Sequence, residues 1–222
     1  MDLQKTDFSV KMQTFYEAIT EENKKFNITA ITDKEDFYIK NVYDCVYGAE
    51  IYDKGASVVE IGSGGGFPSV PIKAEREDLR FTLVESNAKK CGFLCAVKEK
   101  LGFENFNVVC GRAEELSLKK EYREKFDFAI ARAVAPANIL CELLIPFLKV
   151  GGRAVLYKGK NYKEELKSAE TAIGILHAET ERVIGYTLDK GLGERAIVII
   201  KKIKSTDEAY PRKYAKIKKQ PL

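Results

Sequence analysis

The sequence predicts an α/β protein with a mostly parallel sheet, a helical extension before it and an antiparallel hairpin near its C-terminal end. From Ser57 onward, short apolar runs alternate with segments of helical periodicity, a pattern typical of parallel strands joined by right-handed crossovers. One apolar run, 58–61, ends in a glycine loop at 62–66, where backbone amides can approach a ligand without side-chain obstruction. The last two apolar runs are separated by a short glycine-containing segment, which indicates a hairpin.

Each element follows from its local pattern. Apolar residues at helical spacing, among them Phe8, Met12 and Phe15, predict a helix over about 8–25. A second helix is expected over about 34–47, after an ordered connector. The later elements are expected as a strand at 57–61, a short helix after Pro71, a strand at 80–85, a helix at 87–101, strands at 107–110 and 126–130, a helix at 137–148, a strand at 153–157, a helix at 162–176, and hairpin strands at 180–187 and 195–201 joined through 189–193.

A chain of 222 residues fits one main domain, because a single core keeps growing up to ~250 residues. We expect a helical extension over 1–52, a main domain over 53–204 and a basic tail over 205–222. The chain has no run of about 18 apolar residues, and its first residues lack the basic and apolar regions of a targeting segment. We therefore expect a cytoplasmic protein, monomeric and without a membrane partner.

The cysteines are expected to be buried thiols rather than ligands or bridges. There are five of them, and none forms a CxxC pair. Cys91 and Cys95 are four residues apart on a predicted helix, but the single histidine, His177, is far away in sequence. No metal site is expected.

The net charge of +4 is unevenly distributed along the chain. Residues 201–219 carry eight lysines and arginines against two acidic residues, a local net charge of +6. Together with Tyr210 and Tyr214, such a tail can neutralise phosphates and stack on bases. It can equally be a solvated, frayed terminus, and the sequence leaves both interpretations open.

An acidic residue at the end of the second strand indicates a cofactor that contains a nucleoside. Glu85 follows the glycine loop by roughly 20 residues, the place from which a carboxylate grips ribose hydroxyls. Its alternative role is to cap the next helix by accepting from backbone amides. The glycines follow a Gly62-x-Gly64-x-Gly66 pattern, which differs from the spacing of dinucleotide oxidoreductases, and the hairpin also argues against that class. The whole resembles the Rossmann-like fold of class I S-adenosylmethionine-dependent methyltransferases.

The segment after the fourth strand, 131–136, limits which atom of a base the protein is expected to methylate. It contains neither the cysteine that activates carbon 5 of a pyrimidine nor the Asn/Asp-Pro-Pro-aromatic turn that handles exocyclic amines. Arg132 stands there instead, and a cation suits a phosphate, a carboxylate or an electron-rich base edge. Guanine N7 already carries an in-plane lone pair and loses no proton on methylation, so positioning can provide most of the catalysis.

Six blocks of the chain resemble the bacterial small-subunit ribosomal RNA guanine-N7 methyltransferase family, known as RsmG or GidB. They are Phe26 to Thr32, Glu60 to Pro68, Leu83 to Leu94, Gly111 to Glu115, Phe126 to Ala135, and the ending Tyr210 to Leu222. The resemblance implies transfer of a methyl group from S-adenosyl-L-methionine to N7 of a guanine in 16S ribosomal RNA, either free or in the small ribosomal subunit. The alternatives are a methyltransferase acting on another RNA or a small substrate, and a non-catalytic RNA-binding or ribosome-assembly module with a relic cofactor loop.

The resemblance also implies the site residues. Arg132 would be catalytic; cofactor binding would involve Gly62, Gly64, Phe67, Glu85, Ala113, Glu114 and Arg132; candidates for RNA phosphates are Lys158, Lys160, Arg195, Lys201, Arg212 and Lys213. Two positions depart from the family pattern. Asn41 stands where a histidine is usual, and it cannot shuttle a proton near neutral pH. Ser69 stands where glycine is usual, so the backbone there is expected to avoid positive φ.

Overall fold

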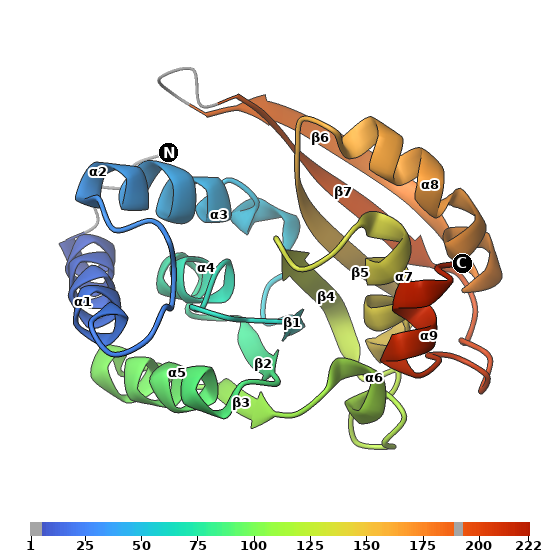
Figure 1. The fold of residues 1–222 in the computed structure, drawn as a ribbon, viewed down its shortest axis with the longest axis horizontal. Coiled ribbons are helices and arrows are strands. Elements are labelled where there is room, and N and C mark those ends of the chain that lie inside the picture. Colours follow the sequence, from blue (N-terminus) through green and yellow to red (C-terminus); the bar gives the residue numbers. More distant parts are fainter. Residues whose placement is uncertain (1–5, 189–192) are drawn as a thin grey trace.

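The protein, described here by a computed structural model over residues 6–188 and 193–222, is built around one twisted sheet (Figure 1). In the described residues the sheet has seven strands in the order β3-β2-β1-β4-β5-β7-β6. The strands are β1 Ser57–Ile61, β2 Arg80–Glu85, β3 Phe106–Cys110, β4 Phe126–Arg132, β5 Leu148–Gly159, β6 Ala178–Thr187 and β7 Glu194–Lys202. Strands β1 to β5 run parallel, and β7 is antiparallel to both β5 and β6. The predicted parallel sheet with a terminal antiparallel hairpin is confirmed.

Most helices lie close to their predicted positions, but the short helix predicted after Pro71 begins at Ser69, and helices at 113–116 and 214–219 were not predicted. They are α1 Thr6–Asn23, α2 Lys34–Asp36, a π-helix Phe37–Tyr43, α3 Asp44–Val46, a 3₁₀ turn Ala49–Ile51, α4 Ser69–Glu75, α5 Ala88–Leu101, α6 Ala113–Leu116, α7 Ala137–Leu144, a 3₁₀ turn Ile145–Phe147, α8 Tyr162–Ile175 and α9 Tyr214–Lys219. Helix α7 ends before the predicted 148, because Pro146 has no N–H to continue the helix. Residues 189–192 of the predicted hairpin connection lie outside the described residues. No helix among the described residues is long and apolar enough to cross a membrane.

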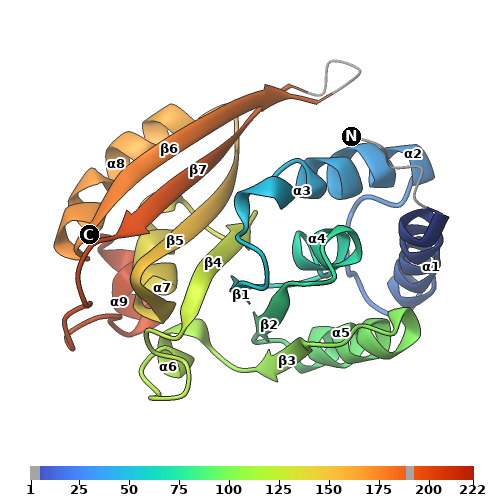
Figure 2. The same cartoon turned by 180° about the vertical axis from the view of Figure 1, so that it is seen from behind.

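The two faces of the sheet carry separate cores, and Figures 1 and 2 show helices on both sides of the sheet. Consecutive strand residues alternate between them, so that Val58 packs with one core and Val59 with the other. Helices α1, α3, α4 and α5 cover the first face, where Phe15 and Phe37 are fully buried. Helices α7, α8 and α9 cover the second face. The N-terminal extension is therefore one side of the main core.

The strand register brings the carboxyl ends of the central strands to one edge. Ile61 pairs with Val84, and Glu60 pairs with Ile130 two residues before Arg132. The strand order reverses between β1 and β4, and ligands of open α/β sheets bind in the crevice outside the strand ends at such a point.

The C-terminal tail is packed against the second face. Helix α9 contacts α7, and Ile217 is fully buried in the second core. Arg212 forms an ion pair with the fully buried Glu142, with 2.6 Å between Nη2 and Oε2. The interpretation of this segment as a frayed terminus is wrong, because a buried carboxylate and a buried isoleucine hold it in place.

Candidate functional site

The glycine loop is clamped to the next strand by Glu85. The Gly64 amide donates to Glu85 Oε2 at 2.8 Å, and the Asn87 amide donates to Oε1 at 2.8 Å. Each carboxylate oxygen keeps a lone pair. Glu85 therefore has the helix-entry contact that we considered as an alternative, and it retains capacity for ribose hydroxyls.

Close packing explains two of the glycines. Gly66 has φ of +91°, and a Cβ there would lie 2.7 Å from Val70 Cγ2. Gly62 has φ of +67°, and its Cβ would lie 2.9 Å from Val134 Cγ2. A side chain at either position would clash and strain the backbone. Ser69 begins α4 and has no positive φ, as the sequence required.

Among the described residues, Asn41, Glu60 and Ser69 carry buried polar atoms without a hydrogen-bond partner. The atoms concerned are Asn41 Nδ2, both carboxylate oxygens of Glu60 and Ser69 Oγ. Burial raises the pKa of Glu60 to about 8, although the neighbouring Ser69 and the charge of Arg132 oppose the shift. A buried polar atom without a partner is costly. Such atoms are available to a polar ligand: the Glu60 carboxylate suits an ammonium and the Asn41 amide suits a carboxylate.

Arg132 ties this region to the N-terminal extension. Its Nε donates to Asp44 Oδ2 at 3.0 Å, and Nη2 donates to the Lys40 carbonyl oxygen at 2.5 Å and to Asn41 Oδ1 at 3.2 Å. The guanidinium carbon also lies 5.9 Å from the ring centroid of Phe67 in the glycine loop. The neighbouring acidic groups raise the pKa of Arg132 despite its burial. Through these contacts the charged Arg132 holds Asp44, Asn41 and Phe67 in place.

Asp44 is the centre of the same network. Its other oxygen, Oδ1, accepts from the Tyr186 hydroxyl at 2.7 Å and lies 4.0 Å from Arg195 Nε. The Tyr186 ring stacks on Tyr47, with centroids 3.9 Å apart. The extension, the end of β4 and the hairpin therefore meet at one carboxylate.

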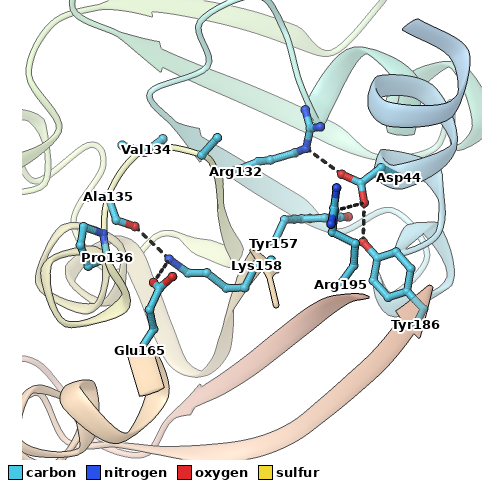
Figure 3. A pocket seen from close by; sticks show the side chains of 12 residues that line it. Asp44, Arg132, Val134, Ala135, Pro136, Tyr157, Lys158, Glu165, Tyr186 and Arg195 are labelled. Carbon is cyan, nitrogen blue, oxygen red and sulfur yellow. Dashed lines mark hydrogen bonds and ion pairs between the residues drawn. The ribbon is translucent and has the colours of Figure 1, made fainter. Parts of the chain in front are cut away.

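Two hollows share Val134 in their linings, and the smaller of them adjoins the glycine loop. The smaller, about 100 Å³, is lined among others by Gly62, Gly111, Ala113 and Glu114, which places the predicted cofactor residues Ala113 and Glu114 beside the loop. The larger, about 480 Å³, lies at the ends of β4 and β5 (Figure 3). Val134 lines both hollows and separates them.

The larger hollow receives some of the predicted RNA-binding residues. Lys158 and Arg195 line it, and the exposed Lys160 follows directly on β5. Lys201 does not: Arg195 pairs with Gly159 but Lys201 pairs with Arg153, six residues along β5 and roughly 20 Å away.

Arg212 and Lys213 lie elsewhere, beside another groove that also includes Arg112 and Tyr214. The guanidinium of Arg212 is bound to Glu142, whereas Lys213 is exposed. Arg212 is therefore a structural anchor of the tail. Residues 6–188 and 193–222 contain no cluster of three or more His, Cys, Asp or Glu side chains that could hold a metal ion.

A family model described as rRNA small subunit methyltransferase G matches residues 9–197. The chain belongs to the rRNA small subunit methyltransferase G family. Curated family members bearing that name come from Brevibacillus brevis, 43% identical over 94% of this chain and 88% of the relative, and from Lactococcus lactis subsp. cremoris, 40% identical over 98% and 95%. The predicted family is confirmed.

Solved structures agree on the fold. An rRNA methylase from Streptococcus thermophilus superposes with a TM-score of 0.51 at 19% identity, covering 73% of this chain and 95% of the other. A SAM-dependent methyltransferase from Methanosarcina mazei gives 0.54 at 13% identity, covering 69% and 95%. The family member described here therefore has the class I methyltransferase fold expected from its sequence.

The site includes residues that the sequence analysis did not single out as site residues. Glu60 could have been found, since it is a lone charge in the buried run 58–61. Asp44 gave a similar signal, as a lone acid among Val42, Cys45 and Val46, whereas Glu165 lies on a polar helical segment and gave none.

Proposed function

We propose that this protein transfers the methyl group of S-adenosyl-L-methionine to N7 of a guanine in 16S ribosomal RNA. The observation that carries the proposal is the place of Val134, between a hollow lined by the predicted cofactor residues and a larger hollow at the ends of β4 and β5. A base in the larger hollow would have only this short wall between it and the cofactor. Family membership supports the ribosomal substrate.

The buried polar atoms fit the cofactor. S-adenosyl-L-methionine, when bound, supplies an electrophilic methyl group on a sulfonium and carries a zwitterionic methionine end. Glu60 would hold its ammonium and Asn41 its carboxylate, since both Glu60 oxygens and Asn41 Nδ2 have no hydrogen-bond partner among the described residues. Glu85 would hold the ribose hydroxyls through its remaining lone pairs, and Ala113 and Glu114 would contact the adenine.

The residues of the larger hollow can supply positioning without a general base. Guanine N7 attacks with a lone pair that already lies in the ring plane, so no side chain needs to take a proton before transfer. Arg132 fixes Asn41 and Phe67, and thereby the methionine side of the cofactor site, from the end of β4. Holding nucleophile and methyl group in line can account for a large part of the rate.

The basic residues near the larger hollow would contact the RNA backbone. Arg195 lines this hollow, the exposed Lys160 follows its lining residue Gly159, and Lys213 offers a further cation near the groove beside α9. This substrate places the protein with the ribosomes in the cytoplasm.

The test is methylation of 16S RNA, and of small subunits, from a strain that lacks the modification, with methyl-labelled cofactor. The expected result is labelled guanine whose N7 modification makes the RNA backbone cleavable at that base. Label in another base, or none in either substrate, would contradict the proposal. Equilibrium binding of S-adenosyl-L-methionine distinguishes the non-catalytic alternative, which predicts RNA binding without cofactor binding.

A further inference from the structure

One wall of the larger hollow carries an ion pair between Lys158 and Glu165. The Lys158 ammonium donates to Glu165 Oε2 at 2.7 Å and to the Ala135 carbonyl oxygen at 2.9 Å. The same Glu165 oxygen accepts from the Ala137 amide at 3.1 Å. The pair is therefore fixed to the segment 135–137, directly after Val134, and in Figure 3 it lies on the side of the hollow away from Asp44.

The pair keeps one donor and one acceptor for a ligand. An ammonium has three N–H donors, and two of those on Lys158 are occupied. Within the described part of the chain, Glu165 Oε2 accepts two hydrogen bonds and Oε1 accepts none, and the carboxylate side chain is 31% exposed. Lys158 is buried, with a side-chain exposure of 7%. A buried donor beside a free carboxylate oxygen is an arrangement that can read a base edge.

The order of donor and acceptor matches guanine. Its Watson–Crick edge presents the O6 acceptor next to the N1–H and N2–H donors, so O6 can face Lys158 while N1–H and N2–H face Glu165 Oε1. Adenine presents the reverse, an N6 amino group toward the ammonium and an N1 lone pair toward the carboxylate. Both purines carry the same N7 nucleophile, and the methyl transfer itself cannot tell them apart.

We propose that Glu165 and Lys158 read the Watson–Crick edge of the target base and restrict methylation to guanine. The inference rests on the proposed function, since it concerns the base that enters the larger hollow. N7 does not belong to the Watson–Crick edge: its lone pair lies on the adjacent Hoogsteen edge and points roughly at right angles to the N1–H bond. A base held by Glu165 at its Watson–Crick edge thus keeps the N7 lone pair free of contacts with Glu165 and available to a neighbouring wall of the hollow. Flipped bases are commonly read through this edge.

The experiment compares guanine with adenine, in otherwise identical 16S RNA, at the nucleotide that the wild-type protein methylates or, in the absence of turnover, protects in a footprint. Two quantities are measured for each RNA: the methylation rate at limiting substrate, and equilibrium binding to protein saturated with S-adenosylhomocysteine. The variants are Glu165→Gln, Lys158→Gln and, as a matched control, Glu164→Gln, which removes the neighbouring exposed charge on the same turn. Thermal unfolding reports any loss of the contact with Ala137.

Glu165→Gln is expected to lower the guanine-to-adenine ratio by about 10-fold to 100-fold, as for the loss of one bidentate base contact. The amide can donate to adenine N1, so adenine gains while guanine loses. Lys158→Gln is expected to shift the ratio in the same direction, and it decides the matter if Glu165→Gln does not fold. Glu164→Gln should leave the ratio unchanged.

An unchanged ratio in both folded variants would overturn the inference. A purely structural role of Glu165 would lower the two rates together and leave the ratio intact. If no RNA is methylated but wild-type binding still prefers guanine and Glu165→Gln loses that preference, the proposed function fails and the base-reading role stands. Absence of both turnover and guanine preference would overturn both.

Discussion

The guanidinium of Arg132 and the carboxylate of Asp44 form an ion pair, with 3.0 Å between Nε and Oδ2, although 88 residues separate them in the chain. The Asp44 side chain is only 5% exposed. Because Tyr186 donates to the other oxygen of Asp44, the pair joins the N-terminal extension, β4 and the hairpin. The extension is thereby a structural part of the site.

Arg132→Ala is expected to reduce the methylation rate at least 100-fold. The variant leaves Asp44 buried with a single strong donor, and the loss of one partner of a buried pair costs about 3 kcal/mol of unfolding free energy. Arg132→Lys should recover part of this stability but little of the rate, because one ammonium cannot bind Asp44, Asn41 and the Lys40 carbonyl in the same geometry.

Thermal unfolding and single-turnover kinetics would measure both effects, with Arg153→Ala as a control. Arg153 pairs with Glu181 on the sheet surface, six positions along β5 from Gly159. Wild-type rates in a folded Arg132→Ala protein would remove Arg132 from the site.

Glu85→Gln is expected to weaken binding of S-adenosyl-L-methionine by about 10-fold, the effect of losing charge-assisted hydrogen bonds to hydroxyls. Glutamine can still accept from Gly64 through its carbonyl oxygen, but its amino group then faces the Asn87 amide. Titration calorimetry with the cofactor and with S-adenosylhomocysteine would measure the change. Equal weakening by the exposed Glu115→Gln would show that the loss of charge alone is responsible.

The strands were predictable because their signal is local. Each central parallel strand is buried on both faces, and the apolar runs 57–61 and 80–85 therefore appear directly in the sequence. The glycine loop was equally visible, since backbone conformation and close packing restrict these positions to glycine. Its neighbour Glu85 was found because the second strand ends there.

The polar network was not predictable, because its contacts join distant segments. Asp44 meets Arg132 and Tyr186 only through the tertiary fold, and no spacing in the chain encodes that meeting. The partners of the basic residues in the tail were also not predictable, because they lie in distant segments of the chain. Lys202 is fully buried and pairs with Glu124, and Arg212 pairs with the fully buried Glu142, so both charges have partners inside the protein.

Glu60 is expected to make cofactor binding depend on pH. Its pKa of about 8 in the folded protein lies above the ordinary value of 4.5, so the carboxyl is mostly protonated at pH 7. A cofactor ammonium beside it would favour the charged form and release close to one proton on binding. Calorimetry in buffers of different ionisation enthalpy would detect that proton, and Glu60→Gln should abolish the release.

The same group should affect the stability of the ligand-free protein. Its folded pKa is raised, so the contribution of Glu60 is fully present below pH 4.5 and is lost as the pH rises toward 8. The unfolding free energy of wild type should therefore fall over this window more steeply than that of Glu60→Gln. Identical slopes, with the exposed Glu104→Gln as reference, would show that Glu60 does not titrate there.

Arg212→Ala and Lys213→Ala are expected to affect different properties. Arg212→Ala leaves the fully buried Glu142 without its guanidinium and should cost about 3–5 kcal/mol of unfolding free energy. Lys213→Ala should change stability by less than about 0.5 kcal/mol, because its side chain is exposed. If Lys213 neutralises a phosphate, the variant should bind 16S RNA more weakly and lower the salt slope by about 1.

Denaturant titration and RNA binding at several salt concentrations would separate the effect of Arg212→Ala on stability from the effect of Lys213→Ala on RNA binding. Truncation after Ser205 would not separate stability from RNA binding, because it removes Ile217 and the partner of Glu142 together with the lysines. A stable Arg212→Ala protein with a reduced salt slope would instead make Arg212 an RNA contact.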